Sequence, residues 1–436
     1  MITTNQQVLP VFMITAGAKS EKTTAALNYF ADKKEFAINL IDPVYRDDGS
    51  KISLWKTLQL ILREIKLKNY EYIIVCLENT RFTTQYSYSK LMDSIAQVQK
   101  LKADALFGSV GSVISTIKVT ENIYWAEGVA GLPFTVLFKS CFDQILSAEK
   151  DMLNQLNQFF LYPFITENAN GQEINLSENS TKEPFIVNHE ELDLLEKVSS
   201  RYNELLTNDQ YAIEQPSFDH ISIPTYIINL PERTDRLAHI KTQFEGKDEF
   251  DVKVIEACKH EIGAVGLWES VRKVIQMAID NDDDVIIIVE DDHEFTANYT
   301  KEYLLKNILD SHRQQVELLL GGIGAFNKAL PITDNRAWIS FFLCTQFVIL
   351  FKPAFQKILD APYDSWVIAD GMLSNIVINK MVLYPFISVQ KIFGYSDATE
   401  IFNVEKDRLE KMFVYAQSRL ERIYSTREIC MKTITT

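Results

Sequence analysis

Short apolar runs alternate with amphipathic segments along both halves of the chain. In the second half, the β-branched and aromatic run 225–229 precedes an amphipathic segment at 233–244, and a second helical pattern at 268–279 precedes the wholly apolar run 285–289. Apolar runs of this length are typical of strands that are buried on both faces. Strands that alternate with helices predict an α/β fold, with a mainly parallel sheet covered by helices.

Large aromatic residues of the first half recur in the second half at one constant offset. Trp55 corresponds to Trp268, Trp125 corresponds to Trp338, and the segment Leu-Tyr-Pro-Phe-Ile occurs at both 161–165 and 383–387. The last match has a larger offset, so the second half has gained residues between positions 359 and 383. A shared register over this length predicts an internal duplication and two tandem sheets of one topology.

Polar and periodic segments divide the chain further. Helical spacing of apolar residues predicts one helix over 192–205 and another over 409–423. We therefore expect a first domain at 1–170, a polar linker with a helix at 171–221, a second domain at 222–400 and a C-terminal amphipathic helix within 401–436.

Composition and charge narrow the functional classes. The 436 residues are 47% hydrophobic and 24% charged, as in globular proteins, and the formal net charge is -15. Nucleic acids are bound through clustered lysine and arginine, so this balance argues against a nucleic-acid partner. There is no signal-peptide pattern at the N-terminus and no apolar stretch of about 18 residues, so we expect a cytoplasmic protein without a transmembrane segment, either free or at the cytoplasmic face of the membrane. The five scattered cysteines are best explained as buried thiols.

Three carboxylates follow the apolar run 285–289 directly, as Glu290-Asp291-Asp292. In open α/β sheets the ligand crevice lies at the carboxyl ends of the strands. Residues two apart on an extended chain face the same side, so Glu290 and Asp292 could bind one cation, and their oxygen atoms suit Mg²⁺ or Mn²⁺ together with a diphosphate. The alternative is a solvated acidic turn that continues the acidic run 282–284.

Further motifs surround this acidic strand end in a fixed order. They are Ile228-Asn229-Leu230-Pro231-Glu232-Arg233-Thr234-Asp235-Arg236, Ile288-Val289-Glu290-Asp291-Asp292, Asp370, Tyr384-Pro385, Gln390 and Ser396-Asp397. With these motifs the second half resembles glycosyltransferase family 25, the lipopolysaccharide-type and collagen-type galactosyl- and glucosyltransferases. One departure is Leu267-Trp268, which stands where the family usually has Ser-His.

The resemblance implies a GT-A-like, Rossmann-like fold that transfers a hexose from a UDP-sugar to a hydroxyl of a glycan, lipid-linked sugar or peptide, mostly with inversion. It implies that Glu290 and Asp292 hold Mn²⁺ or Mg²⁺, which stabilises the departing diphosphate. The residues expected to contact the donor and its metal are Asn229, Arg233, Arg236, Glu290 and Asp291. A solvated helix face is the alternative explanation for the two arginines.

An inverting transferase also needs a carboxylate that accepts the proton of the attacking hydroxyl. Our candidate for this catalytic base is Asp370, with Asp364 and Asp397 as rivals. A helix N-cap would explain Asp370 equally well.

The first copy lacks the acidic motif. At the positions of Glu290, Asp291 and Asp292 it has Leu77, Glu78 and Asn79. It is therefore expected to be a degenerate domain that supports the second copy or binds the acceptor. Two other functions remain open: a non-catalytic binding or scaffold protein, and a nucleotidyltransferase, although the glycine-rich loop expected after the first strand of a nucleotidyltransferase is missing from 229–233.

Overall fold

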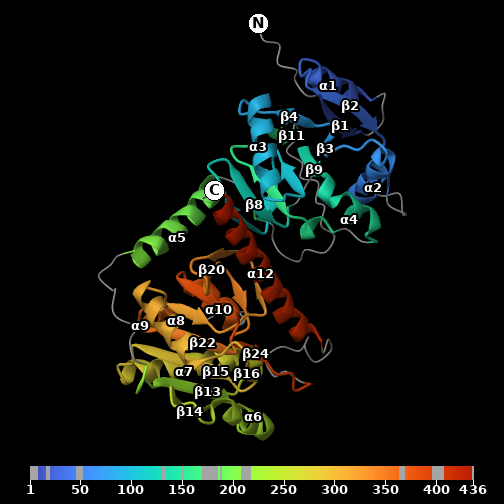
Figure 1. The fold of residues 1–436 in the computed structure, drawn as a ribbon. Coiled ribbons are helices and arrows are strands. Elements are labelled where there is room, and N and C mark those ends of the chain that lie inside the picture. The colour runs from blue at the N-terminus through green and yellow to red at the C-terminus, as the bar shows by residue number, and fades with distance from the viewer. Residues whose placement is uncertain are drawn as a thin grey trace. The chain divides into compact units, whose positions relative to one another are not determined.

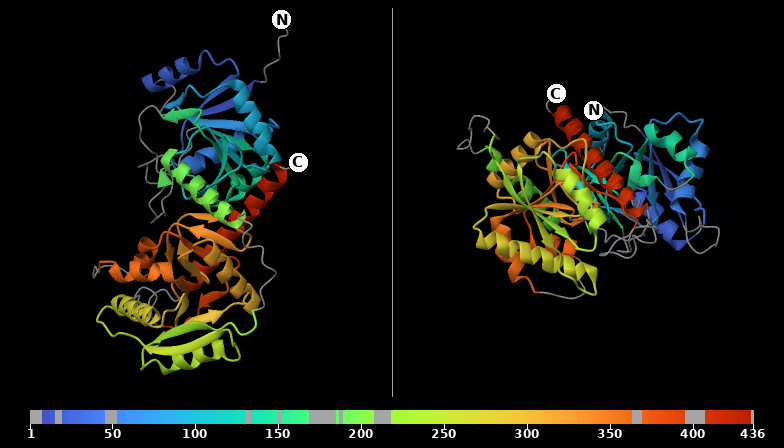
Figure 2. Two further views of the ribbon diagram at one scale, coloured as in Figure 1. Left: turned by 90° about the vertical axis from the view of Figure 1, so that its left-hand side faces the viewer. Right: turned by 90° about the horizontal axis from the view of Figure 1, so that it is seen from below.

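The chain forms two compact units, which we describe separately in a computed structural model (Figures 1 and 2). Unit 1 comprises Met1–Leu192 and Thr426–Thr436, and unit 2 comprises Asp193–Ser425. The structure describes residues 8–15, 20–45, 53–129, 134–149, 152–168, 185–186, 189–207, 218–362, 369–394 and 407–434. Asp364, Ser396 and Asp397, which the sequence singled out, lie outside these ranges.

Unit 1 is built on a mixed sheet of eight described strands in the order β2-β1-β3-β9-β5-β10-β8-β7. Its strands are β1 (Leu9–Ile14), β2 (Phe36–Ile41), β3 (Tyr72–Leu77), β5 (Ala105–Phe107), β7 (Ser115–Lys118), β8 (Ile123–Glu127), β9 (Phe134–Phe138) and β10 (Gln158–Leu161). Its helices are α1 (Glu21–Phe30), α2 (Leu54–Ile65), α3 (Tyr88–Lys100), α4 (Phe142–Ser147) and the 3-10 turns η1 (Lys139–Cys141) and η2 (Leu153–Gln155).

Unit 2 contains a sheet of eight described strands in the order β14-β13-β15-β22-β17-β23-β20-β19. Its strands are β13 (Ile223–Asn229), β14 (Phe250–Glu256), β15 (Val285–Glu290), β17 (Leu318–Leu320), β19 (Ala329–Pro331), β20 (Arg336–Ile339), β22 (Phe347–Phe351) and β23 (Lys380–Leu383). Its helices include α6 (Thr234–Phe244), α7 (Gly263–Asp280), α8 (Lys301–Arg313), α9 (Lys352–Asp360) and α10 (Ala369–Ile376).

Four two-stranded ribbons complete the strands. The ribbons of unit 1 pair β4 (Thr80–Phe82) with β11 (Thr166–Asn168) and β6 (Ser112–Val113) with β12 (Phe185–Ile186). Those of unit 2 pair β16 (His293–Phe295) with β24 (Ser388–Gln390) and β18 (Ala325–Phe326) with β21 (Phe342–Leu343).

The two sheets have the same strand order, which is the arrangement that the sequence repeat predicts. Their pairing corrects the expectation of mainly parallel sheets. In unit 2, β13 runs parallel to β14 and β15, and β17 runs parallel to β23, but β22 is antiparallel to both of its neighbours, and β20 is antiparallel to β19 and β23. The sheets are therefore mixed, and helices flank both of them (Figures 1 and 2).

The repeated tryptophans are buried, as expected from their place in the repeat. Trp55 and Trp268 lie in the matching helices α2 and α7, and Trp125 and Trp338 lie in the matching strands β8 and β20. These side chains belong to the core of their own unit.

Both helices predicted outside the sheets are present. The first is α5 (His189–Thr207), and the boundary between the units falls inside it. The second is α12 (Arg408–Ile434), whose residues Phe413, Ala416, Leu420 and Ile423 are buried at helical spacing. None of the helices in the described parts of the chain is long and apolar enough to cross a membrane.

Candidate functional site

The acidic motif lies at the carboxyl end of the central strands of unit 2. β13 and β15 are parallel neighbours, and their register places Ile228 opposite Glu290. The residues that follow both strands therefore meet at one edge of the sheet, where α/β proteins bind ligands. The ribbon of β16 and β24 then brings Gln390 next to Asp292, 3.4 Å from its Oδ1.

A cavity of about 480 Å³ opens at this edge. Five of the residues predicted from the sequence line it: Arg236, Glu290, Asp291, Asp292 and Asp370. Its other walls come from the segment 257–263 after β14, from Cys344 and Thr345, and from the segment 390–394 after β24. The cavity is large enough for a small-molecule ligand, for which pockets of about 300–1,000 Å³ are usual.

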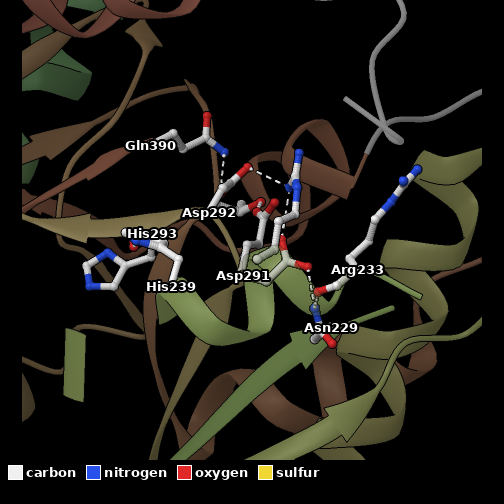
Figure 3. A network of polar contacts seen from close by, with 10 residues as sticks. Asn229, Arg233, His239, Asp291, Asp292, His293 and Gln390 are labelled. Carbon is white, nitrogen blue, oxygen red and sulfur yellow. Dashed lines mark hydrogen bonds and ion pairs between the residues drawn. The ribbon is translucent and has the colours of Figure 1, made fainter. Parts of the chain in front are cut away.

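Asp291 is held by two side chains from the first strand and helix of unit 2 (Figure 3). Asn229 Nδ2 donates to Asp291 Oδ2 at 2.8 Å. Arg236 Nη1 donates to Asp291 Oδ1 at 2.9 Å. Arg236 Nη1 also lies 3.3 Å from Asp292 Oδ2. Both oxygens of Asp291 have close protein partners, so this residue anchors the loop. The two oxygens of Asp292 also have protein partners, but at the longer distances of 3.3 Å from Arg236 and 3.4 Å from Gln390. Glu290 and Asp292 are therefore the carboxylates that are held less tightly within the protein.

Arg233 differs from Arg236 in its position. It precedes the first turn of α6, and its side chain extends away from the carboxylates (Figure 3), while its backbone oxygen accepts from Asn229 Nδ2 at 3.3 Å. Of the two arginines predicted to face a phosphate, the structure thus places Arg236 in the cavity wall and directs Arg233 outward.

Glu290 and Asp370 converge on one hydroxyl group. Thr345 Oγ1 lies 2.7 Å from Glu290 Oε1 and 3.3 Å from Asp370 Oδ1. Asp370 Oδ2 also accepts the backbone N–H of Cys344 at 2.7 Å, and Cys344 has a positive φ of 78°. A non-glycine residue in this conformation is uncommon, and such strain is often found at functional sites. Asp370 is in the first turn of α10, but its carboxylate binds this loop and is not the N-cap that the sequence left open.

Burial and mutual repulsion weaken the acidity of these carboxyl groups. Burial, together with the charges of Asp292 and Asp370, raises the pKa of Glu290 well above its ordinary value. Burial raises the pKa of Asp292 to about 7, although Arg236 opposes the shift, and burial also raises the pKa of Asp370. Crowded acids with raised pKa values are typical of functional sites, and a bound cation would relieve their repulsion.

The donor set can be compared with the needs of a divalent cation. No group of three His, Cys, Asp or Glu side chains within the described ranges has the spacing of a complete metal site. Mg²⁺ is usually held by only one or two carboxylates, and substrate phosphates and water supply its other oxygens. Glu290 and Asp292 fit that incomplete donor set.

Sequence patterns did not indicate several residues around the cavity. Thr345 comes from the start of the β22 region, His239 from α6, and Lys391 and Phe393 from the segment after β24. The sequence signal for Lys391 was its position directly after Gln390, which the family pattern contains. Thr345 had no such signal, because the fold alone brings it to Glu290.

The corresponding edge of unit 1 is arranged without the charged cluster. β3 ends at Leu77, as β15 ends at Glu290, and each faces the end of its first strand. Glu78 Oε2 accepts a hydrogen bond from Thr23 Oγ1 at 2.8 Å, and Thr23 occupies the third position of α1 as Arg236 occupies the third position of α6. A neutral donor in unit 1 therefore stands where unit 2 has an arginine.

The fold and the site define unit 2 as a mixed α/β domain with an acidic ligand cavity at the carboxyl ends of two parallel strands. No protein family and no curated protein matches the chain. Among solved structures, A197 from STIV is 10% identical over 42% of this chain and 100% of its own, with a TM-score of 0.25. Two structures of UDP-glucose pyrophosphorylase are 12% and 10% identical, over 35% and 46% of this chain and 84% and 82% of theirs, with TM-scores of 0.23 and 0.26. Similarities of this size do not assign the chain to a family.

Proposed function

We propose that unit 2 is a metal-dependent glycosyltransferase that moves a hexose of the galactose or glucose type from a UDP-sugar to an acceptor hydroxyl. The observation that carries the proposal is the cavity at the carboxyl ends of β13 and β15, where the partly buried carboxyl groups of Glu290, Asp292 and Asp370 lie together. The order of motifs shared with glycosyltransferase family 25 supplies the substrate class.

In this proposal Glu290 and Asp292 bind Mn²⁺ or Mg²⁺. Such an ion acts as a Lewis acid that stabilises the charge on a departing nucleoside diphosphate. Asn229 and Arg236 fix Asp291 from two sides, and Arg236 and Gln390 orient Asp292. The site is thus held in one geometry before the donor binds, as electrostatic catalysis requires.

Asp370 is the proposed base of an inverting transfer. Its carboxylate lines the cavity, and burial raises its pKa, which makes it a better proton acceptor near neutral pH than an exposed aspartate. The N–H of Cys344 holds Asp370 Oδ2, and Thr345 lies near Oδ1. The acceptor hydroxyl, from a glycan, a lipid-linked sugar or a peptide, would lose its proton to Asp370 as it attacks the anomeric carbon.

We further infer that the two units arose by duplication and that unit 1 is a degenerate copy. The equal strand orders and the matching tryptophans support this inference. Leu77 and Asn79 offer no carboxylate for a metal, so unit 1 is assigned to support or to acceptor binding.

The test is a panel of nucleotide sugars added to the full chain with and without Mn²⁺. A ligand that binds only the folded state raises the melting temperature. We expect UDP-glucose or UDP-galactose to do so only with Mn²⁺, and we expect slow release of UDP by hydrolysis even without an acceptor. Asp292→Asn should abolish both effects, whereas Asp251→Asn, on an exposed part of β14, should keep them. If no UDP-sugar binds in the presence of Mn²⁺, unit 2 is not a UDP-sugar transferase, and a non-catalytic binding protein becomes the better description.

A further inference from the structure

We propose that Lys391, positioned by His239, is the cation that binds the diphosphate of the donor. The inference rests on the proposed function, and it names a residue that the sequence motifs did not assign. Lys391 lines the cavity and follows directly after Gln390, the side chain that contacts Asp292.

Both the backbone and the side chain of Lys391 are held beside the acidic motif. Its backbone N–H donates to the backbone oxygen of Asp292 at 2.7 Å. Its Nζ lies 3.2 Å from His239 Nδ1, and His239 Nε2 lies 3.0 Å from the backbone oxygen of His293. A carbonyl oxygen can only accept and an ammonium group can only donate, so these contacts require a neutral His239 that carries its proton on Nε2.

In this arrangement the ammonium group of Lys391 is held in place and still has donors available for a ligand. An ammonium group has three donors, and His239 uses one of them. Among the described residues, the side-chain hydrogen-bond partner of Lys391 is an imidazole and not a carboxylate, so its ammonium group can still pair with an anionic ligand. The ring of Phe393 lies 5.3 Å from Nζ, and it also packs edge-on against His239 at 5.5 Å.

The other cations of the cavity wall are already matched with carboxylates. Arg236 contacts Asp291 and Asp292, and Lys259 pairs with Glu232 at 3.0 Å. A nucleoside diphosphate brings several negative charges to a wall that already holds Glu290 and Asp292, and one divalent ion does not balance them all. A further positive group is needed on the ligand side, and Lys391 is at that position.

Unit 1 provides an independent comparison. The sixth residue of α6 is His239, whereas the sixth residue of α1 is Ala26. The residue after β24 is Lys391, whereas the sequence has Ala169 after the matching strand β11. Unit 1 thus lacks counterparts of Lys391 and His239, and it also lacks counterparts of the carboxylates of Glu290 and Asp292. This is expected if these four residues of unit 2 bind one ligand.

The test measures binding of UDP and of uridine, each with Mn²⁺ at fixed ionic strength, to four full-length proteins: wild type, Lys391→Met, Lys391→Arg and the control Lys253→Met. Lys253 lies on β14 with a half-exposed side chain and does not line the cavity. Hydrogen bonds between charged groups are worth enough that Lys391→Met should weaken UDP binding by about tenfold to a hundredfold. Uridine has no phosphate, so its affinity should change by less than about twofold in the same variant. Lys391→Arg should restore most of the UDP affinity, and Lys253→Met should leave it nearly unchanged.

His239→Leu separates a positioning role from a purely structural one. It should weaken UDP binding by a few-fold and leave uridine binding unchanged, because the charge of Lys391 remains but its position is no longer fixed. A Lys391→Met protein that binds UDP as tightly as wild type overturns the inference and leaves the proposed function standing. A wild-type protein that binds no UDP with Mn²⁺ overturns both.

Discussion

Asp292→Asn should make the metal-free protein more stable at pH 8. Burial raises the pKa of Asp292 to about 7 from 3.8, and its side chain is only 14% exposed. At pH 8 folding therefore places an ionised carboxylate where charge is disfavoured. A group whose pKa is higher in the folded than in the unfolded state stabilises the fold fully below the unfolded pKa, here about 4, and that contribution is lost as the pH rises through about 7.

The pKa difference sets the size of the effect. Each pKa unit corresponds to about 1.36 kcal/mol, so the penalty at pH 8 is at most about 4 kcal/mol, and at pH 5 it is about 2 kcal/mol. Asparagine removes this penalty but also removes one ion pair of Arg236, which keeps its contact with Asp291. We expect a net gain of about 1–3 kcal/mol in the free energy of unfolding at pH 8, and a clearly smaller gain at pH 5.

The assay is urea unfolding at pH 5 and pH 8 in the presence of a chelator. The control is Asp251→Asn, because Asp251 is 52% exposed and its ion pair with Lys253 lies at the surface, where such pairs contribute about 0–1 kcal/mol. A variant that is less stable than wild type at pH 8 would refute this account of Asp292. So would a variant whose free energy of unfolding differs from that of wild type by the same amount at pH 5 and at pH 8. Mn²⁺ with UDP should reverse the order of stabilities, since only the wild type can bind the metal.

Three further predictions concern the support of the cavity and its counterpart in unit 1. Arg236→Met leaves Asp291 buried without its guanidinium partner and should cost about 3–5 kcal/mol in urea unfolding at pH 8; a cost below about 1 kcal/mol would contradict this role. Gly266→Ala places a Cβ 2.4 Å from the backbone oxygen of Cys258, so the cavity wall must move, and UDP affinity measured by titration should fall by about tenfold. Glu78→Ala should leave UDP-sugar turnover within about twofold of wild type, while the lost hydrogen bond with Thr23 lowers stability by about 1 kcal/mol; a large loss of turnover would mean that unit 1 takes part in the reaction.

The sequence predicted the elements of the fold better than their pairing. Runs such as 285–289 and the stripes of α5 and α12 are local patterns, and each of them forms the predicted strand or helix. The insertion of β22 between β15 and β17 is a long-range pairing, and its antiparallel direction leaves no periodic signal in the sequence. Strands that are buried on both faces have the same continuous apolar sequence pattern whether their neighbours are parallel or antiparallel.

The candidate site was predicted where its residues are close in sequence or belong to a motif. Glu290 and Asp292 adjoin a strand end, and Asp370 followed from the order of motifs, and all three line one cavity. The contact of Thr345 with Glu290 spans 55 residues and that of Lys391 with His239 spans 152 residues. Such contacts depend on the folded arrangement of the strands, so local sequence patterns could not reveal them.

The two units differ in the residues at the end of the third strand of each sheet, where unit 2 has its acidic cluster. Unit 1 forms a sheet of the same strand order in which β3 ends at Leu77, Asn79 follows two residues later, and a threonine is the partner of Glu78. The charged cluster is therefore not a requirement of this fold. Burying carboxylates that repel one another costs free energy, and an apolar or amide side chain of similar size avoids that cost. A domain that nevertheless places two carboxylates, a paired arginine and a lysine around one cavity is therefore consistent with the proposed function, in which a divalent cation and a diphosphate would supply the balancing charges.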